Sequence, residues 1–178
     1  MNKQNLFNIG ENSSIHIEST SEQFMHKIHI TCGKNSIIKI LGIKVLNSTL
    51  RIHLGDDAEL IIGPEQLMNG NVYIAAHEPS KILIGANCLW SNVSMWSSDM
   101  HKIISLDTNT RINHGQNITI GNYVWFGDQS LILKGAQIHD GCIVGARSVV
   151  TKSTPCESNS IIAGNPAKIL RRNIKWQL

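Results

Sequence analysis

The feature that most constrains this chain is a six-residue repeat of large apolar residues between positions 120 and 150. A small or β-branched residue stands two positions before each large one, and glycine follows three of the six. This joint pattern is much harder to obtain by chance than the spacing alone. The large residues are Ile120, Phe126, Ile132, Ile138, Val144 and Val150, and the residues that precede them are Ile118, Val124, Ser130, Ala136, Cys142 and Ser148.

A period of six residues corresponds to one short strand and one corner, so about three repeats close a triangular coil. Successive coils stack at about 4.8 Å and pair each other's backbone groups. The repeat therefore predicts an all-β, left-handed parallel β-helix with the large residues inside. The same phase extends back through Ile84, Trp90 and Trp96, which we also expect inside. Cys88 and Cys142 occupy the small inward position, which indicates core residues rather than nucleophiles or metal ligands.

The composition agrees with a single β-solenoid domain over residues 1–178. Hydrophobic residues make up 42% of the chain and charged residues 16%, which excludes a disordered protein. We expect irregular N-terminal coils over 1–80, one coil over 81–96, a protruding loop over 97–117, regular coils over 118–152 and a short C-terminal tail over 153–178. A separate small β-domain over 1–80 is the weaker alternative. The polar loop interrupts the repeat, and long loops on rigid scaffolds often carry function.

Charge and cysteine content restrict the partners and the compartment. The net charge of +3 is too small to indicate nucleic-acid binding. The C-terminal cluster of Lys168, Arg171, Arg172 and Lys175 is either solvated or binds the phosphates of a small ligand. The four cysteines form no paired motif, the N-terminus has no signal-peptide pattern, and no apolar stretch is long enough to span a membrane. These features predict a cytoplasmic protein.

Several ordered stretches resemble the hexapeptide-repeat acetyltransferases. The resemblance covers about residues 84–172, is weak in the N-terminal half, and is specific because the pieces occur in order. Within it, Ser-Asp-x-His followed by Trp125 resembles the branch that O-acetylates bacterial surface glycans such as capsule, sialic-acid polymer and O-antigen. The stretches are Ser98-Asp99-Met100-His101, Ile120–Gly127, Ile132–Gly135, Gly145–Lys152 and Ala163–Lys168.

This resemblance implies a homotrimer with active sites between subunits, acetyl-CoA as the acyl donor and a carbohydrate acceptor. Acetyl transfer to an alcohol requires a base for the hydroxyl proton and donors for the developing oxyanion. His101 is the candidate catalytic base, because histidine can cycle its proton near neutral pH. Its context separates it from the other histidines, and His114 in the same loop is the only rival. Asp99 is expected to orient His101 or bind sugar hydroxyls, or else to be a turn or cap residue. Ser98 is a further substrate-binding candidate.

Trp125 precedes an inward residue, so its side chain should project outward. Two interpretations remain open for this ring. It packs in a subunit interface, or, as the resemblance implies, it walls the acceptor or thioester site and offers its indole N–H to the oxyanion as a catalytic group. The two roles are compatible.

The resemblance also implies a CoA groove along the outer edge of the regular coils. Main-chain contacts are expected near Gly127, Ala146 and Thr151. Lys152 is the candidate for the pyrophosphate, and Lys168 and Arg171 are the candidates for the adenosine end. For Arg172 and Lys175 solvated surface charge is the preferred interpretation.

Other functions fit the sequence less well. A metal-dependent hydratase on this fold needs a His-x-x-x-x-His pair, which the chain lacks, so no metal site is predicted. The helical domain of serine acetyltransferases and the nucleotide-binding domain of sugar-nucleotide N-acetyltransferases have no counterpart. A xenobiotic acetyltransferase that modifies antibiotics and a non-catalytic solenoid that binds or scaffolds remain the alternatives. The sequence therefore predicts an acetyl-CoA-dependent O-acetyltransferase that acts directly, without a covalent enzyme intermediate.

Overall fold

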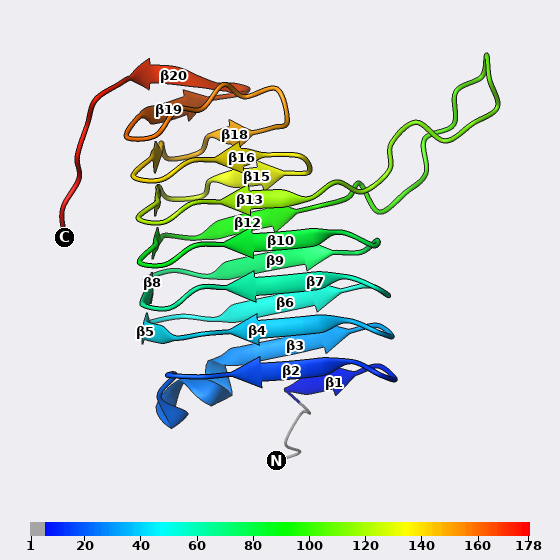
Figure 1. Ribbon diagram of the computed structural model, residues 1–178, viewed down its shortest axis with the longest axis horizontal. Coiled ribbons are helices and arrows are strands. Elements are labelled where there is room, and N and C mark those ends of the chain that lie inside the picture. The colour runs from blue at the N-terminus through cyan, green and yellow to red at the C-terminus, as the bar shows by residue number, and fades with distance from the viewer. Residues whose placement is uncertain (1–5) are drawn as a thin grey trace.

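The computed structural model describes residues 6–178, which coil into a left-handed parallel β-helix with three faces (Figure 1). The strands of each face stack in parallel, and only the final pair, β19 with β20, is antiparallel. One short 3-10 segment, η1 (Glu22–Lys27), is the only helical element in the described part of the chain. The fold class predicted from the six-residue repeat is confirmed.

Each face is one sheet. The first face contains β1 (Phe7–Ile9), β3 (Ile28–Cys32), β6 (Leu50–Leu54), β9 (Val72–Ala76), β12 (Val93–Trp96), β15 (Leu131–Leu133) and β18 (Val149–Val150). The second contains β2 (Ser14–Ile17), β4 (Ile37–Ile40), β7 (Glu59–Ile62), β10 (Lys81–Ile84), β13 (Ile118–Ile120) and β16 (Gln137–Ile138). The third contains β5 (Ile43–Leu46), β8 (Gln66–Met68), β11 (Leu89–Trp90), β14 (Trp125–Phe126), β17 (Ile143–Val144), β19 (Ile161–Gly164) and β20 (Ala167–Arg171).

In the C-terminal half the repeat determines the interior as predicted. All twelve residues of the pattern, large and small, are at most 3% exposed. Phe126 pairs with Val144, which lies 18 residues later, so one coil consists of three six-residue units. Cys88 and Cys142 are fully buried in the core, as expected.

The N-terminal half uses the same three faces with a longer coil. Ile28 pairs with Leu50, and Leu50 pairs with Val72, so one coil contains 22 residues. The additional residues lengthen the strands and the corners, which is why a search for six-residue units detects no regular repeat there. Stacked asparagines mark one of these corners, where Asn47 Nδ2 donates to Asn69 Oδ1 at 3.0 Å.

The expectation that Trp96 lies inside is wrong. Trp90 aligns with Phe126 and Met95 aligns with Ile132, so this corner of the coil is one residue shorter than its counterpart in the next coil. The alternation therefore changes phase, Met95 points inward, and Trp96 lies on the outer side of the first face. Its ring packs 5.2 Å from the ring of Tyr73.

Trp90 does lie inside, and the interior adapts to its size and polarity. Its ring stacks on Phe126 with the centroids 4.5 Å apart. Its indole N–H donates to Oε1 of Gln66 at 2.8 Å, and both side chains are fully buried. Gln66 Nε2 in turn donates to backbone carbonyls, including that of Gly85 at 2.8 Å. A buried tryptophan is thus accommodated because a buried glutamine satisfies its polar edge.

Two segments leave the stack on opposite sides (Figure 1). The segment 97–117 emerges between β12 of the first face and β13 of the second and projects far from the coils. The C-terminal segment 172–178 runs back along the outside of the third face, where Trp176 Nε1 donates to the carbonyl of Tyr123 at 2.9 Å. No helix in residues 6–178 is long and apolar enough to cross a membrane.

Candidate active site

The loop that carries His101 is tied to the solenoid at its base and paired with itself further out. Ser97 N donates to Ala75 O at 3.0 Å, and Gln116 N donates to Ser97 O at 2.9 Å, which closes the base. Ile104 forms an antiparallel bridge with Arg111. The loop is therefore a hairpin-like arm whose base is fixed to the coils. His101 lies in the part of the loop that leads away from the coils and is exposed to solvent.

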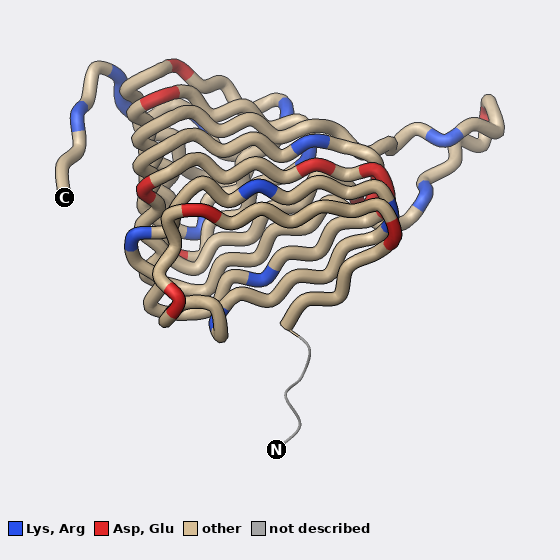
Figure 2. The backbone as a smooth tube through the Cα atoms, turned by 60° about the horizontal axis from the view of Figure 1, so that its bottom comes forward, with Lys and Arg blue, Asp and Glu red and all other residues tan. Residues whose placement is uncertain are grey.

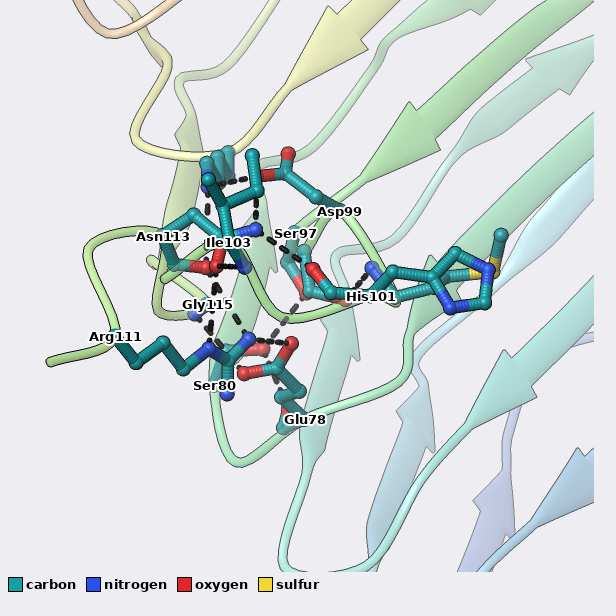
Figure 3. Close-up of polar contacts among 12 residues, drawn as sticks. Glu78, Ser80, Ser97, Asp99, His101, Ile103, Arg111, Asn113 and Gly115 are labelled. Atoms are coloured by element: carbon teal, nitrogen blue, oxygen red, sulfur yellow. Dashed lines mark hydrogen bonds and ion pairs between the residues drawn. The ribbon is translucent and has the colours of Figure 1, made fainter. Parts of the chain in front are cut away.

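A tight turn precedes His101. The N–H of His101 donates to Asp99 O at 2.7 Å across Met100, whose φ of 61° lies in the left-handed region. A three-residue turn with positive φ is unfavourable for a side chain such as methionine, and such conformations persist only where surrounding contacts hold them. Glu78, Asp99, Arg111 and Asn113 form a polar cluster at the root of the loop. The turn directs the imidazole away from this cluster (Figure 3).

Asp99 belongs to this polar cluster rather than to the imidazole. Its Oδ2 accepts hydrogen bonds from Lys134 Nζ and from Asn113 Nδ2, the latter at 2.9 Å. The ion pair with Lys134, followed by the hydrogen bond from Asn113, lowers the pKa of Asp99 below its ordinary value. Asp99 is thus a carboxylate anchored to the coil below the loop, and within residues 6–178 the His101 ring has no hydrogen-bond partner.

Glu78 and Arg111 connect the loop to the preceding coil. Arg111 Nη2 donates to Glu78 Oε1 at 2.6 Å, and the two side chains are 16% and 18% exposed. The hydrogen bond from Arg111 lowers the pKa of Glu78. The other carboxylate oxygen accepts the N–H of Gly115 at 3.2 Å, so Glu78 holds the returning strand of the loop at two points. Sequence reasoning did not identify Glu78, Arg111, Asn113 or Lys134, because no local motif links them.

Ser98 and Asp99 line a small cavity at the root of the loop. Its volume is about 250 Å³, and it lies against Trp96, Met100 and Leu133 on the outer side of the first face. Ser98 is only 4% exposed, and its Oγ accepts the N–H of Met100 at 3.3 Å. The hydroxyl of Ser98 therefore supports the turn before His101 as well as forming part of the cavity wall.

Trp125 lies on β14 of the third face and is 38% exposed. Strands β5 and β8 of that face lie on the side of the solenoid away from the loop (Figure 1). The ring of Trp176 from the C-terminal segment lies 6.1 Å from it, and Tyr123 lies 5.7 Å from Trp176. The sequence singled out Trp125 but not its aromatic partners. One chain thus does not bring Trp125 and His101 together.

The residues assigned to CoA fall into two groups. Gly127 and Ala146 follow β14 and β17 at the corner between the third and first faces, and a Cβ on Gly127 would lie 2.6 Å from Ala146 N. A side chain at position 127 would collide with the backbone of the next corner, so glycine permits this close approach.

The second group lies at the C-terminal end of the stack. Thr151 and Lys168 line a groove of about 450 Å³, and Lys152 packs over Gly135 beside it. Arg171 is exposed at the end of β20. Arg172, which also lines the groove, pairs with Glu157 at 2.9 Å on the surface. Basic residues mark the C-terminal segment and both arms of the loop (Figure 2).

Comparison with known proteins relates this geometry to enzymes. Residues 117–152 match the family described as bacterial transferase hexapeptide (six repeats). The polysialic acid O-acetyltransferase of Neisseria meningitidis is 38% identical over 170 residues, which are 94% of this chain and 77% of that protein.

Solved structures agree. A polysialic acid O-acetyltransferase is 26% identical with a TM-score of 0.54, covering 97% of this chain and 90% of its own. A galactoside acetyltransferase in complex with coenzyme A is 26% identical with a TM-score of 0.56, covering 74% of this chain and 63% of its own.

Proposed function

This chain belongs to the hexapeptide-repeat acetyltransferases and is an acyltransferase, and on that premise we propose that it transfers acetyl from acetyl-CoA to a hydroxyl of a bacterial surface glycan or its precursor. The observation that carries the proposal is the alignment with the Neisseria enzyme. It extends over 94% of the chain and therefore includes the loop and the N-terminal coils, whereas the family match covers only the repeats at 117–152.

The loop supplies the base in this proposal. The imidazole of His101 takes the proton of the acceptor hydroxyl while the hydroxyl oxygen attacks the thioester carbon. Collapse of the tetrahedral intermediate breaks the carbon–sulfur bond, and the imidazolium returns its proton to the departing thiolate. The exposed ring has no hydrogen-bond partner among residues 6–178 and is therefore open to both substrates. The Glu78 carboxylate is occupied by Arg111 and the Asp99 carboxylate by Lys134, so neither competes for this role.

Trp125 is proposed to act on the carbonyl oxygen. Its indole N–H donates to the oxyanion of the tetrahedral intermediate, where a fixed donor is worth more than in water. Because Trp125 lies on the third face and the loop projects from the opposite side of the solenoid, we expect His101 of one subunit to meet Trp125 of another. A homotrimer with three such interfaces provides this arrangement with one kind of contact.

A mixed oligomer tests this arrangement. His101→Ala and Trp125→Ala, which we expect to be nearly inactive on their own, are unfolded, mixed in equal amounts and refolded together. If each site takes one residue from each of two subunits, half of the subunits supply each residue, and activity recovers to about a quarter of the wild-type value. Refolded wild-type protein is the control for the yield. No recovery with intact mixed trimers would place both residues of a site in one subunit.

Acetyl-CoA is proposed to bind along the corner that carries Gly127 and Ala146, with its phosphates near Lys152, Lys168 and Arg171. The cations beside the groove at the C-terminal end fit the phosphates of an extended anionic ligand. The thioester of bound acetyl-CoA would supply the activated acetyl group. Isothermal titration with CoA tests this part, because a scaffold protein would not bind it.

The acceptor is tested by thiol release. Wild-type protein with acetyl-CoA is assayed against polysialic acid, sialic acid, neutral hexoses and antibiotic acceptors. We expect release that depends on a carbohydrate and saturates with it. Release with antibiotics alone would instead support a xenobiotic acetyltransferase, and CoA binding without transfer to any acceptor would argue against the proposed reaction.

A further inference from the structure

Asn113 is the residue on which the contacts at the root of the loop converge. It is 6% exposed, although it lies in a segment that is otherwise largely exposed. Its amide oxygen accepts the N–H of Ile103 at 2.7 Å and Nε of Arg111 at 3.2 Å. Its amide nitrogen donates to His101 O at 2.7 Å and to Asp99 Oδ2 at 2.9 Å. The side chain therefore uses its full hydrogen-bonding capacity.

The two acceptors of the Asn113 amide lie at the two ends of the turn across Met100 (Figure 3). One is the side chain of Asp99, where the turn begins, and the other is the carbonyl of His101, where it ends. A positive φ at methionine is energetically unfavourable, so contacts from outside the turn must stabilise it; we call these contacts of Asn113 the clamp. Asn113 supplies that clamp from the opposite strand of the loop.

A second set of contacts fixes Asn113. Arg111 reaches its carbonyl oxygen with Nη2 at 3.2 Å as well as its side chain, and Glu78 on the preceding coil holds Arg111 at 2.6 Å. Lys134 on the following coil reaches the Asn113 carbonyl at 3.4 Å and pairs with Asp99. The clamp is thus connected both to the coil that precedes the loop and to the coil that follows it.

We propose that Asn113, held by Glu78 and Arg111, is the positioning residue that sets the direction of His101 for acyl transfer. The role of the His101 direction in catalysis rests on the proposed function. The hydrogen bonds of Asn113 to the turn do not depend on that function. Asn113 has no hydrogen bond to the His101 ring and does not itself line the small cavity at the root of the loop. It contacts the turn through the His101 carbonyl and the Asp99 carboxylate, so it acts on the ring through the turn.

Asn113→Asp is the variant that tests the clamp. It has nearly the same shape and keeps an acceptor for Ile103 and Arg111, but it replaces the donating nitrogen with an oxygen that faces the Asp99 carboxylate and the His101 carbonyl. The turn then loses both clamping bonds. We expect kcat to fall about 10-fold to 100-fold with KM for acetyl-CoA changed less than about 2-fold. Asn109→Asp, in the exposed end of the same loop, introduces the same charge and should retain wild-type turnover.

A double variant separates positioning from a general loss of structure. If Asn113 acts through His101, then His101→Ala with Asn113→Asp is no slower than His101→Ala alone. Multiplied losses would overturn the proposal, as would full turnover in Asn113→Asp. Glu78→Gln, which weakens the support of Arg111, should give a smaller loss in the same direction. A cooperative thermal unfolding transition and an unchanged oligomer size establish that each variant is folded.

Amide hydrogen exchange keeps this test separate from the proposed reaction. In Asn113→Asp the amide of His101 should exchange at least about 10-fold faster than in the wild type, whereas those of β12 and β13 should not change. Unchanged exchange at His101 would overturn the clamp. Absence of acetyl transfer by the wild-type protein, together with faster exchange in the variant, would refute the proposed reaction and leave the clamp standing.

Discussion

The rings of Trp125 and Trp176 lie 6.1 Å apart on the third face of the solenoid. Trp176 lies in the C-terminal segment, is 9% exposed and donates its indole N–H to the carbonyl of Tyr123. The C-terminal segment thus packs beside the tryptophan that the sequence selects as a functional residue. The surroundings of Trp125 therefore include a residue about fifty positions later in the chain.

Removing Trp176 should loosen the C-terminal segment and expose Trp125. Trp176→Ala deletes a buried ring and leaves the Tyr123 carbonyl without its donor, at a cost of about 1–3 kcal/mol. Hydrogen exchange of residues 172–178 should accelerate while the coils remain protected. Trp176→Phe retains much of the ring packing and should lose only about 1 kcal/mol. Equal protection of residues 172–178 in the alanine variant and the wild type would contradict the packing role.

Trp125→Phe tests the proposed oxyanion donor. The substitution keeps an aromatic ring on the surface and removes the N–H. If the indole N–H stabilises the intermediate, kcat falls about 10-fold to 100-fold with little change in either KM. Steady-state kinetics with a saturating carbohydrate acceptor measure the effect. Unchanged kcat would leave only the packing role for this residue.

Gln66 should be essential for the stability of the coil around Trp90. Gln66→Leu preserves approximate volume but leaves the Trp90 N–H without an acceptor at full burial, which should cost about 2–4 kcal/mol. Equilibrium unfolding in urea measures this difference. Gln137→Leu, at an exposed position of β16, should change the free energy of unfolding by less than about 0.5 kcal/mol.

The pair of Glu78 and Arg111 predicts a dependence of stability on pH. The pKa of Glu78 lies below its ordinary value of 4.5 because Arg111 donates to the carboxylate. The ionised form is therefore favoured in the folded state, and its contribution is complete above pH 4.5 and lost as the pH falls through the lower folded pKa. Glu78→Gln should unfold less steeply with acidification below that pH. An identical acid profile for the two proteins would argue against the ion pair.

Much of the solenoid follows from the sequence because its interior repeats. A narrow triangular stack requires large residues at one inward position and small ones at the other, and residues such as Phe126 and Cys142 reveal that rule directly. Trp96 does not follow this rule because the corner between Trp90 and Met95 is one residue shorter than its counterpart in the next coil. No residue type in the sequence indicates this change. The 22-residue coils of the N-terminal half keep the faces but not the six-residue spacing, as the pairing of Leu50 with Val72 shows.

The candidate site is less accessible to sequence reasoning, for a physical reason. His101 and Trp125 stand in short motifs, but the groups that hold the loop come from three different parts of the chain. Glu78 and Arg111 are 33 residues apart, and Asp99 and Lys134 are 35 apart. Only the stacking of coils brings them together.

The turnover of His101→Ala with a carbohydrate acceptor is the most direct test of the account. Thiol release from acetyl-CoA should fall at least about 1,000-fold in kcat relative to wild type, because both the base and the proton donor are lost. CoA binding and oligomer size should be unchanged, and His114→Ala should retain wild-type turnover. Full turnover by His101→Ala would contradict the central claim that this loop histidine carries the proton in acetyl transfer.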